Sequence, residues 1–136
     1  MKDDIIINKI ETIKRCLSRI NEEYVTFEDE LESNYTKQDS IILNLERAAQ
    51  ASIDLSTHII RVKNLGIPKT SRDVFSLLDA SKIITSTTSE QMKKMVGFRN
   101  IAVHDYQNIS LDIVKSILTN HLIDFECFIQ EIINTE

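Results

Sequence analysis

Apolar residues recur every three or four positions through most of the chain, which is the period of an amphipathic α-helix. The first such segment runs from about Asp4 to Tyr24. The acidic stretch Glu28 to Glu32 that follows is expected to form a loop or a short helix. The apolar stripe of the segment consists of Ile6, Ile10, Ile13, Leu17, Ile20 and Tyr24. The domain is therefore expected to begin with a helix that buries one face.

The second segment, from about Lys37 to Lys63, is the longest and carries two neighbouring apolar stripes. These stripes are Ile41, Leu45, Ala48, Ser52, Leu55, Ile59 and Val62, and beside them Ile42, Ala49, Ile53 and Ile60. A helix that is apolar over so much of its surface is buried on two sides or lies at the centre of an oligomer.

A polar flank of the same helix carries Asp54, His58 and Arg61 at helical spacing. We interpret it as a polar strip whose members satisfy each other's hydrogen bonds. The alternative is that Asp54 and His58 lie behind a catalytic site and orient its groups.

Glycine and proline mark the end of the second helix, at Gly66 and Pro68. A short helix is expected next, capped by Thr70 or Ser71 and reaching as far as about Ile84. A loop should then separate it from the rest of the chain.

The fourth predicted helix begins where Thr87 and Glu90 stand in capping-box spacing, and it should end near His104. After a connection, Ser110 is expected to cap a last long helix. The stripe of that helix is Leu111, Val114, Leu118, His121, Phe125, Phe128 and Ile132. We interpret His121 as a satisfied histidine of the core or of an interface.

The whole sequence of 136 residues thus predicts a single all-α domain, residues 1–136, built as an up-and-down bundle of about five helices. Only two glycines and one proline are present, which leaves little material for the tight turns of a sheet. Cys16 and Cys127 lie in separate apolar segments, so two buried thiols are expected rather than a disulfide.

The formal net charge is −5, from 16 basic and 21 acidic residues. No overall basic field attracts nucleic acid, so any such contact must be local or be built by bringing subunits together. The N-terminal segment is charged and amphipathic, which is typical neither of a signal peptide nor of a membrane span. We expect a cytoplasmic protein.

The residues richest in chemistry lie at the end of the fourth predicted helix. Arg99 falls in the middle of its apolar stripe, which consists of Met92, Met95, Val96 and Val103. Desolvating an arginine costs several kcal/mol unless an anionic group meets it. Arg99 therefore indicates a partner, which is either a bound anion or a carboxylate of another helix.

Asn100 and His104 are four residues apart and share one edge of the helix surface. Ideal geometry places Arg99 and His104 roughly 140° apart around the axis, so they are able to flank one substrate without touching each other. Tyr106 follows where the helix should end. A permanently charged guanidinium beside a titratable imidazole is suited to binding a phosphate and transferring a proton to or from it. The alternative is a structural role, in which the arginine pairs with a carboxylate of another helix and the histidine simply lies near a helix end.

Several other kinds of site lack their residues in this sequence. There is no Glu-x-x-His pair for a di-iron centre and no His-Glu-x-x-His motif or cysteine cluster for zinc, and two glycines cannot build a phosphate-binding loop. We therefore expect no metal and no cofactor. Two possibilities remain from the residues themselves. Either Arg99 and His104 carry out acid–base catalysis, or the protein catalyses no reaction.

The spacing of arginine, four residues, histidine, one residue and tyrosine resembles the signature of the HEPN superfamily. Within it the chain resembles the HepT-type toxins, which are paired with MntA-type minimal nucleotidyltransferase antitoxins. The segment 46–60 resembles the second helix of that family, and the turn 66–68 and the segment 95–100 fit as well.

The resemblance implies a metal-independent ribonuclease that acts on RNA as a homodimer, with the two motifs facing each other across a composite cleft. It implies catalytic roles for Arg99, Asn100 and His104, and it makes Tyr106 the residue to which the antitoxin adds AMP. The alternative is a non-catalytic helical interaction module bound to a nucleotidyltransferase.

Overall fold

The computed structural model describes residues 3–27 and 31–135, and all regular secondary structure in these ranges is helical. The α-helices are α1 (Asp4–Phe27), α2 (Tyr35–Lys63), α3 (Asp73–Ala80), α4 (Ser86–His104), α5 (Leu111–Ser116) and α6 (Leu122–Thr135). A 3₁₀ turn, Tyr106–Asn108, follows α4, and a π-helical turn, Ile117–His121, joins α5 to α6 as one continuous helix. Counted in this way, the described ranges hold five helices, which confirms the predicted all-α bundle.

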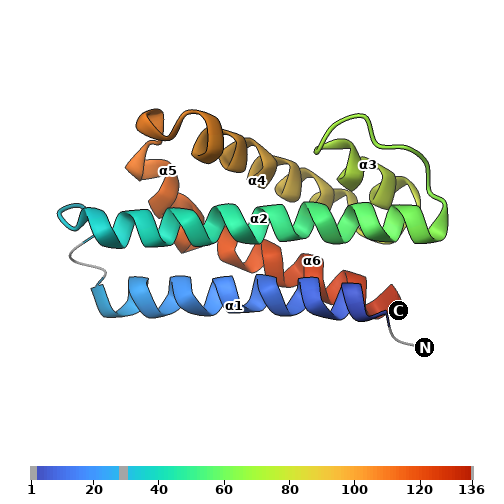
Figure 1. Cartoon of the computed structure of the whole chain (residues 1–136), viewed down its shortest axis with the longest axis horizontal. Helices are drawn as coiled ribbons and strands as arrows, with labels where there is room; N and C mark the ends of the chain where they lie inside the picture. Colours follow the sequence, from blue (N-terminus) through green and yellow to red (C-terminus); the bar gives the residue numbers. More distant parts are fainter. Residues whose placement is uncertain (1–2, 28–30, 136) are drawn as a thin grey trace.

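Helix α2 lies in the middle of the bundle (Figure 1). Helix α1 runs antiparallel along one side of it and α4 lies on the opposite side, while α3 packs against both α2 and α4. Helix α6 crosses behind α2 and contacts α4 and α1. The end of α4 therefore lies beside the beginning of α2.

The apolar stripes of the first two helices form the core, as the sequence predicts. All the stripe residues of α2 are buried except Val62, which lies in the last turn of the helix and is 56% exposed. The stripe of α1 is buried up to Ile20, and Tyr24 packs against the core while partly exposed. Of the two arrangements expected for α2, the structure shows burial on two sides within one chain.

The start of α4 differs from the prediction. The helix begins at Ser86, and its cap is Thr85, whose Oγ1 accepts a hydrogen bond from the N–H of Thr88 at 3.1 Å. Glu131 of α6 accepts the N–H of Thr85 at 2.6 Å and the hydroxyl hydrogen of Thr88. A carboxylate from another helix thus takes the place that the predicted capping box gave to Glu90.

Other helix ends also differ from the sequence-based expectation. Helix α2 ends at Lys63 as predicted, but its C-cap is Asn64 rather than a glycine, and Asn64 adopts the left-handed conformation (φ 55°) that usually favours glycine there. Helix α3 ends at Ala80 rather than near Ile84, because Lys82 turns the chain at a φ of 61°. Of the two candidate caps, Thr70 accepts the N–H of Asp73 at 3.2 Å.

The two cysteines differ in burial. Cys16 is buried, but Cys127 is exposed on α6, so the expectation of two buried thiols is wrong for the second.

The acidic stretch that follows α1 is described only in part. Its residues 31–33 form a turn, and residues 28–30 lie outside the described ranges. None of the helices in the described ranges combines the length and the hydropathy that crossing a membrane requires.

The cap that Glu131 supplies should be measurable in the stability of the protein. Replacing Glu131 by alanine removes an anionic acceptor from the first turn of α4, and we expect the free energy of unfolding to fall by about 1–2 kcal/mol. Urea unfolding monitored by circular dichroism measures this change. The matched control is Glu126→Ala, which removes an exposed carboxylate of the same helix. Equal losses in the two variants would show that the cap contributes nothing specific.

Candidate functional site

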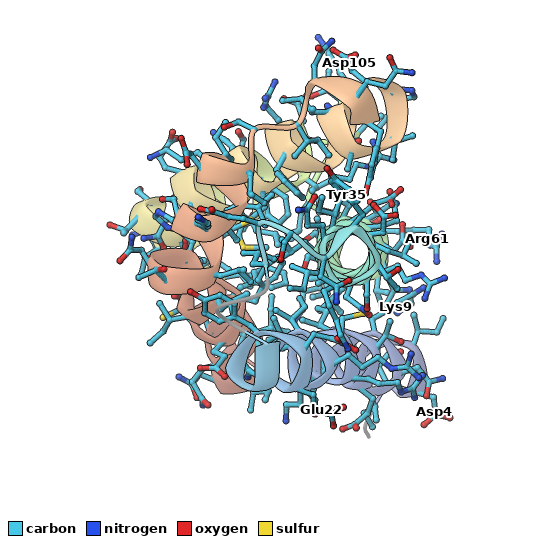
Figure 2. All side chains as sticks on the ribbon, turned by 90° about the vertical axis from the view of Figure 1, so that its left-hand side faces the viewer. Asp4, Lys9, Glu22, Tyr35, Arg61 and Asp105 are labelled. Atoms are coloured by element: carbon cyan, nitrogen blue, oxygen red, sulfur yellow. The ribbon has the colours of Figure 1, made fainter. Side chains whose placement is uncertain are left out.

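The candidate site lies at the end of α4 and in the 3₁₀ turn that follows it. Arg99, Asn100 and His104 belong to the last two turns of α4, and Tyr106 begins the 3₁₀ turn. Asp105, between the two elements, is the C-cap of α4. In Figure 2, α2 is seen nearly end-on, and Asp105 lies at the outer edge of the bundle, on the opposite side of α2 from α1.

Arg99 is half-buried, and its guanidinium is only partly satisfied. Nη1 donates a hydrogen bond to Oδ1 of Asn100 at 2.7 Å, while Nε is buried and has no partner. Among the ion pairs of the described residues, none includes Arg99. The expected alternative, a carboxylate of another helix, is therefore not found in the part of the chain that the structure describes, and N–H donors of Arg99 stay available for an anion.

The apolar stripe around Arg99 is shorter than predicted. Met92, Met95 and Val96 are buried, but Val103 is 45% exposed and does not continue the stripe. Ile101, in the same turn of α4, is also exposed. In the last turn of α4, Ala102 still belongs to the core, whereas Ile101, Val103 and His104 are exposed.

His104 ends α4 with an exposed side chain, for which the described structure contains no hydrogen bond. Asn100 lies one helical turn earlier and is half-buried, but it bonds to Arg99 rather than to His104. The last two turns of α4 therefore carry a half-buried guanidinium and, five residues later, an exposed imidazole. The imidazole is free to exchange a proton with a bound molecule.

Tyr106 is held by a residue that the sequence analysis did not single out. Its hydroxyl donates a hydrogen bond to Oδ1 of Asp39, which lies 67 residues earlier in the second turn of α2. Partial burial, followed by the hydrogen bond and the negative charge of Asp39, raises the pKa of Tyr106 to about 12. An aspartate near a helix start carries no pattern that identifies it, so only the antiparallel packing of α2 and α4 reveals it.

Asp54 and His58 contact residues of α2 itself, Lys9 of α1 and Asp3, which directly precedes α1. Asp54 accepts a hydrogen bond from Gln50 at 2.9 Å and lies 3.5 Å from Nζ of Lys9, while Nε2 of His58 lies 2.6 Å from Asp3 and Nδ1 lies 3.2 Å from Arg61. Figure 2 shows Lys9 and Arg61 on the same side of the α1–α2 pair, with Asp105 far above them. These contacts favour the polar strip, and a supporting role in catalysis stays a prediction.

The remaining histidine is also partnered. Nδ1 of His121 lies 2.9 Å from Oδ2 of the buried Asp124, in agreement with a satisfied histidine. No group of three or more potential metal-ligating side chains comes together within residues 3–27 and 31–135.

The chain matches the family model described as ribonuclease HepT-like over residues 7–132. It is 53% identical over 130 residues to the mRNA nuclease HepT of Shewanella oneidensis, covering 96% of this chain and 97% of that protein. The chain therefore belongs to the HepT-like ribonuclease family.

Two further comparisons extend the relationship. The tRNA nuclease HepT of Aphanizomenon flos-aquae is 27% identical over 129 residues, which cover 94% of this chain and 87% of that protein. The solved structure of the tri-AMPylated Shewanella oneidensis HEPN toxin in complex with the MNT antitoxin superposes with a TM-score of 0.92 at 52% identity, covering 99% of this chain and all of that one.

The contact between Tyr106 and Asp39 predicts how the tyrosine titrates. At pH 10, where a free tyrosine is half ionised, Tyr106 should stay protonated. Asp39→Asn should increase the phenolate fraction, because the neighbouring negative charge is lost while the partial burial stays. Ultraviolet difference spectra measure this, with Tyr106→Phe as the blank for the other two of the three tyrosines. Since the folded-state pKa is raised, the stabilisation from this tyrosine is complete below pH 10 and is lost as the pH rises towards about 12. Identical spectra for the parent and Asp39→Asn would contradict this assignment.

Proposed function

We propose that this protein is the toxin of a toxin–antitoxin pair, acting in the cytoplasm as an endoribonuclease that needs no metal ion. The observation that carries the proposal is the partly satisfied guanidinium of Arg99, which has no carboxylate partner in the described structure and comes five residues before the unbonded imidazole of His104 in α4. The names of the relatives, an mRNA nuclease and a tRNA nuclease, support RNA as the substrate.

The proposed reaction begins when a ribose 2′-hydroxyl attacks the adjacent phosphorus. His104 acts as general base or as general acid. As base it takes the hydroxyl proton, and water protonates the 5′-oxygen as its P–O bond breaks; as acid it protonates the 5′-oxygen, and water takes the hydroxyl proton. Arg99 donates hydrogen bonds to the non-bridging phosphate oxygens and stabilises the charge of the transition state. Asn100 holds the guanidinium through its 2.7 Å hydrogen bond. The products carry a cyclic phosphate or its hydrolysed form.

A homodimer completes the site in this proposal. The motif of one chain lies on an open surface that exposes apolar side chains of the last turn of α4, Ile101 and Val103 among them. A second copy placed over this surface would bury them and bring a second Arg99 to the same cleft. Two guanidinium groups facing each other would create the local positive charge that a protein of net charge −5 otherwise lacks.

The proposed control of the toxin is AMP addition to Tyr106 by an MntA-type minimal nucleotidyltransferase antitoxin. Tyr106 is 42% exposed and lies two residues after His104, so a modifying enzyme has access to it. Each AMP adds a negatively charged phosphate and a bulky base beside the motif, which repels the RNA backbone and occupies its space. The tri-AMPylated state of the Shewanella oneidensis toxin supports this form of control.

Cleavage of a defined RNA in excess EDTA tests the ribonuclease proposal. The parent should cut, and His104→Ala should lower the rate by about 10²–10⁴-fold because the group that transfers the proton is lost. Arg99→Lys should also cleave slowly, since it keeps the charge but loses the planar fork that holds two phosphate oxygens.

His121→Ala is the matched control for this assay, because it removes a histidine that lies outside the motif. It should cleave at the rate of the parent. Equal rates for the parent and His104→Ala would refute the catalytic assignment. A parent that binds the nucleotidyltransferase but cuts no RNA, and whose intact mass shows no AMP, would favour the interaction module.

The modification proposal is tested by Tyr106→Phe in cells that also express the nucleotidyltransferase. This variant lacks the hydroxyl that receives AMP, so it should stay toxic where the parent is neutralised, and its intact mass should show no added AMP. Full neutralisation of Tyr106→Phe would instead show that the antitoxin blocks the toxin by covering it.

A further inference from the structure

We propose that Asp39 is the general base for the modification of Tyr106, so that the toxin itself supplies the proton acceptor for AMP transfer. This inference rests on the proposed AMP addition to Tyr106 and goes one step further. It assigns to the modified protein a catalytic residue that would otherwise be sought in the modifying enzyme.

The geometry places the acceptor on the hydrogen that must leave. The Tyr106 hydroxyl donates its hydrogen bond directly to Oδ1 of Asp39, although the two residues belong to different elements. Asp39 is exposed and takes part in none of the ion pairs of the described residues, so its carboxylate is not neutralised by a lysine or arginine. The hydroxyl oxygen keeps lone pairs that can face an incoming nucleotide.

The other titratable groups around Tyr106 do not offer the same contact. His104 and Asp105 precede it in the chain, and the described structure gives neither side chain a hydrogen bond to the hydroxyl. Lys37, two residues before Asp39 in α2, pairs with Glu23 at 2.6 Å. Asp39 is therefore the charged group that acts on the hydroxyl oxygen.

The chemistry requires such an acceptor. A phenol whose pKa is raised to about 12 carries its proton at neutral pH, so attack by a preformed phenolate is suppressed. The proton must therefore leave as the new bond forms, and a carboxylate already hydrogen-bonded to it can take it without rearrangement.

Oη of Tyr106 attacks the α-phosphorus of a nucleoside triphosphate, the Oη–P bond forms, and the P–O bond to pyrophosphate breaks. Pyrophosphate leaves with the bonding electrons, and the hydroxyl proton passes to the carboxylate of Asp39. Asp39 becomes neutral in the same step, which removes a negative charge from beside the new phosphodiester.

The substitution Asp39→Asn tests whether Asp39 acts as a general base or only positions the tyrosine. The asparagine side chain has nearly the same shape, and its Oδ1 still accepts a hydrogen bond from the hydroxyl, but it cannot take up the proton. Asp39→Glu keeps the carboxylate. Asp112→Asn is the charge-matched control, because it removes an exposed carboxylate at the start of α5.

The experiment incubates each full-length variant with the cognate nucleotidyltransferase and ATP, and follows the first AMP addition by intact mass from mildly acidic to mildly alkaline pH. We expect Asp39→Asn to slow this addition by about 10²–10⁴-fold and to make its rate rise with pH, because hydroxide must replace the base. Asp39→Glu should recover much of the rate, and Asp112→Asn should match the parent. Unmodified Asp39→Asn should cleave RNA like the parent, which shows that it folds.

The outcomes distinguish the inference from the proposed function. If the parent acquires AMP and Asp39→Asn does so at the same rate, Asp39 is not the base, while the modification of Tyr106 stands. A slower Asp39→Asn with the pH profile of the parent and no recovery in Asp39→Glu would also overturn the inference, since that pattern indicates a positioning role. If the parent acquires no AMP at all, the proposed modification itself is wrong.

Discussion

Helix α2 is packed from two opposite sides, and the position of every functional group follows from this arrangement. Its small residues Ala48, Ala49 and Ser52 are fully buried, which allows neighbouring helices to approach closely. The hydroxyl of Ser52 bonds back to the carbonyl of Ala48 at 2.8 Å, so the burial leaves no polar group unsatisfied there. Because α1 and α4 occupy these two sides, the beginning of α2 lies beside the end of α4.

The two ends of α4 differ in how well their polar groups are hydrogen-bonded. Glu131 satisfies the first turn of α4, whereas the last turns leave buried Nε of Arg99 without a hydrogen bond and His104 exposed. A buried donor without a partner costs roughly 1–3 kcal/mol. The fold retains this cost at the arginine to which the proposed function assigns the phosphate, and function and stability commonly compete at such a position.

Local sequence patterns predicted what depends on a single helix. The stripes of α1 and α2, the end of α4 at His104 and the unusual position of Arg99 follow from periodicity and from the cost of burying charge. The sequence did not reveal the cap by Glu131 or the contact between Asp39 and Tyr106, because each joins residues more than forty positions apart. The exposure of Val103 was missed for the same reason, since it depends on where the neighbouring helices end.

His104, to which we assign RNA cleavage, and Tyr106, to which we assign its control, are separated by one residue and differ in their surroundings. A general acid–base histidine must exchange its proton with substrate, and His104 is exposed and unbonded in the described structure. A tyrosine that serves as an acceptor for a transferred group must present its hydroxyl in a fixed direction, and the hydrogen bond to Asp39 does this for Tyr106. Since Asp39 belongs to α2, the hydrogen bond that orients Tyr106 does not involve the side chains of α4. Cleavage and its control can therefore occupy neighbouring residues without either group fixing the other.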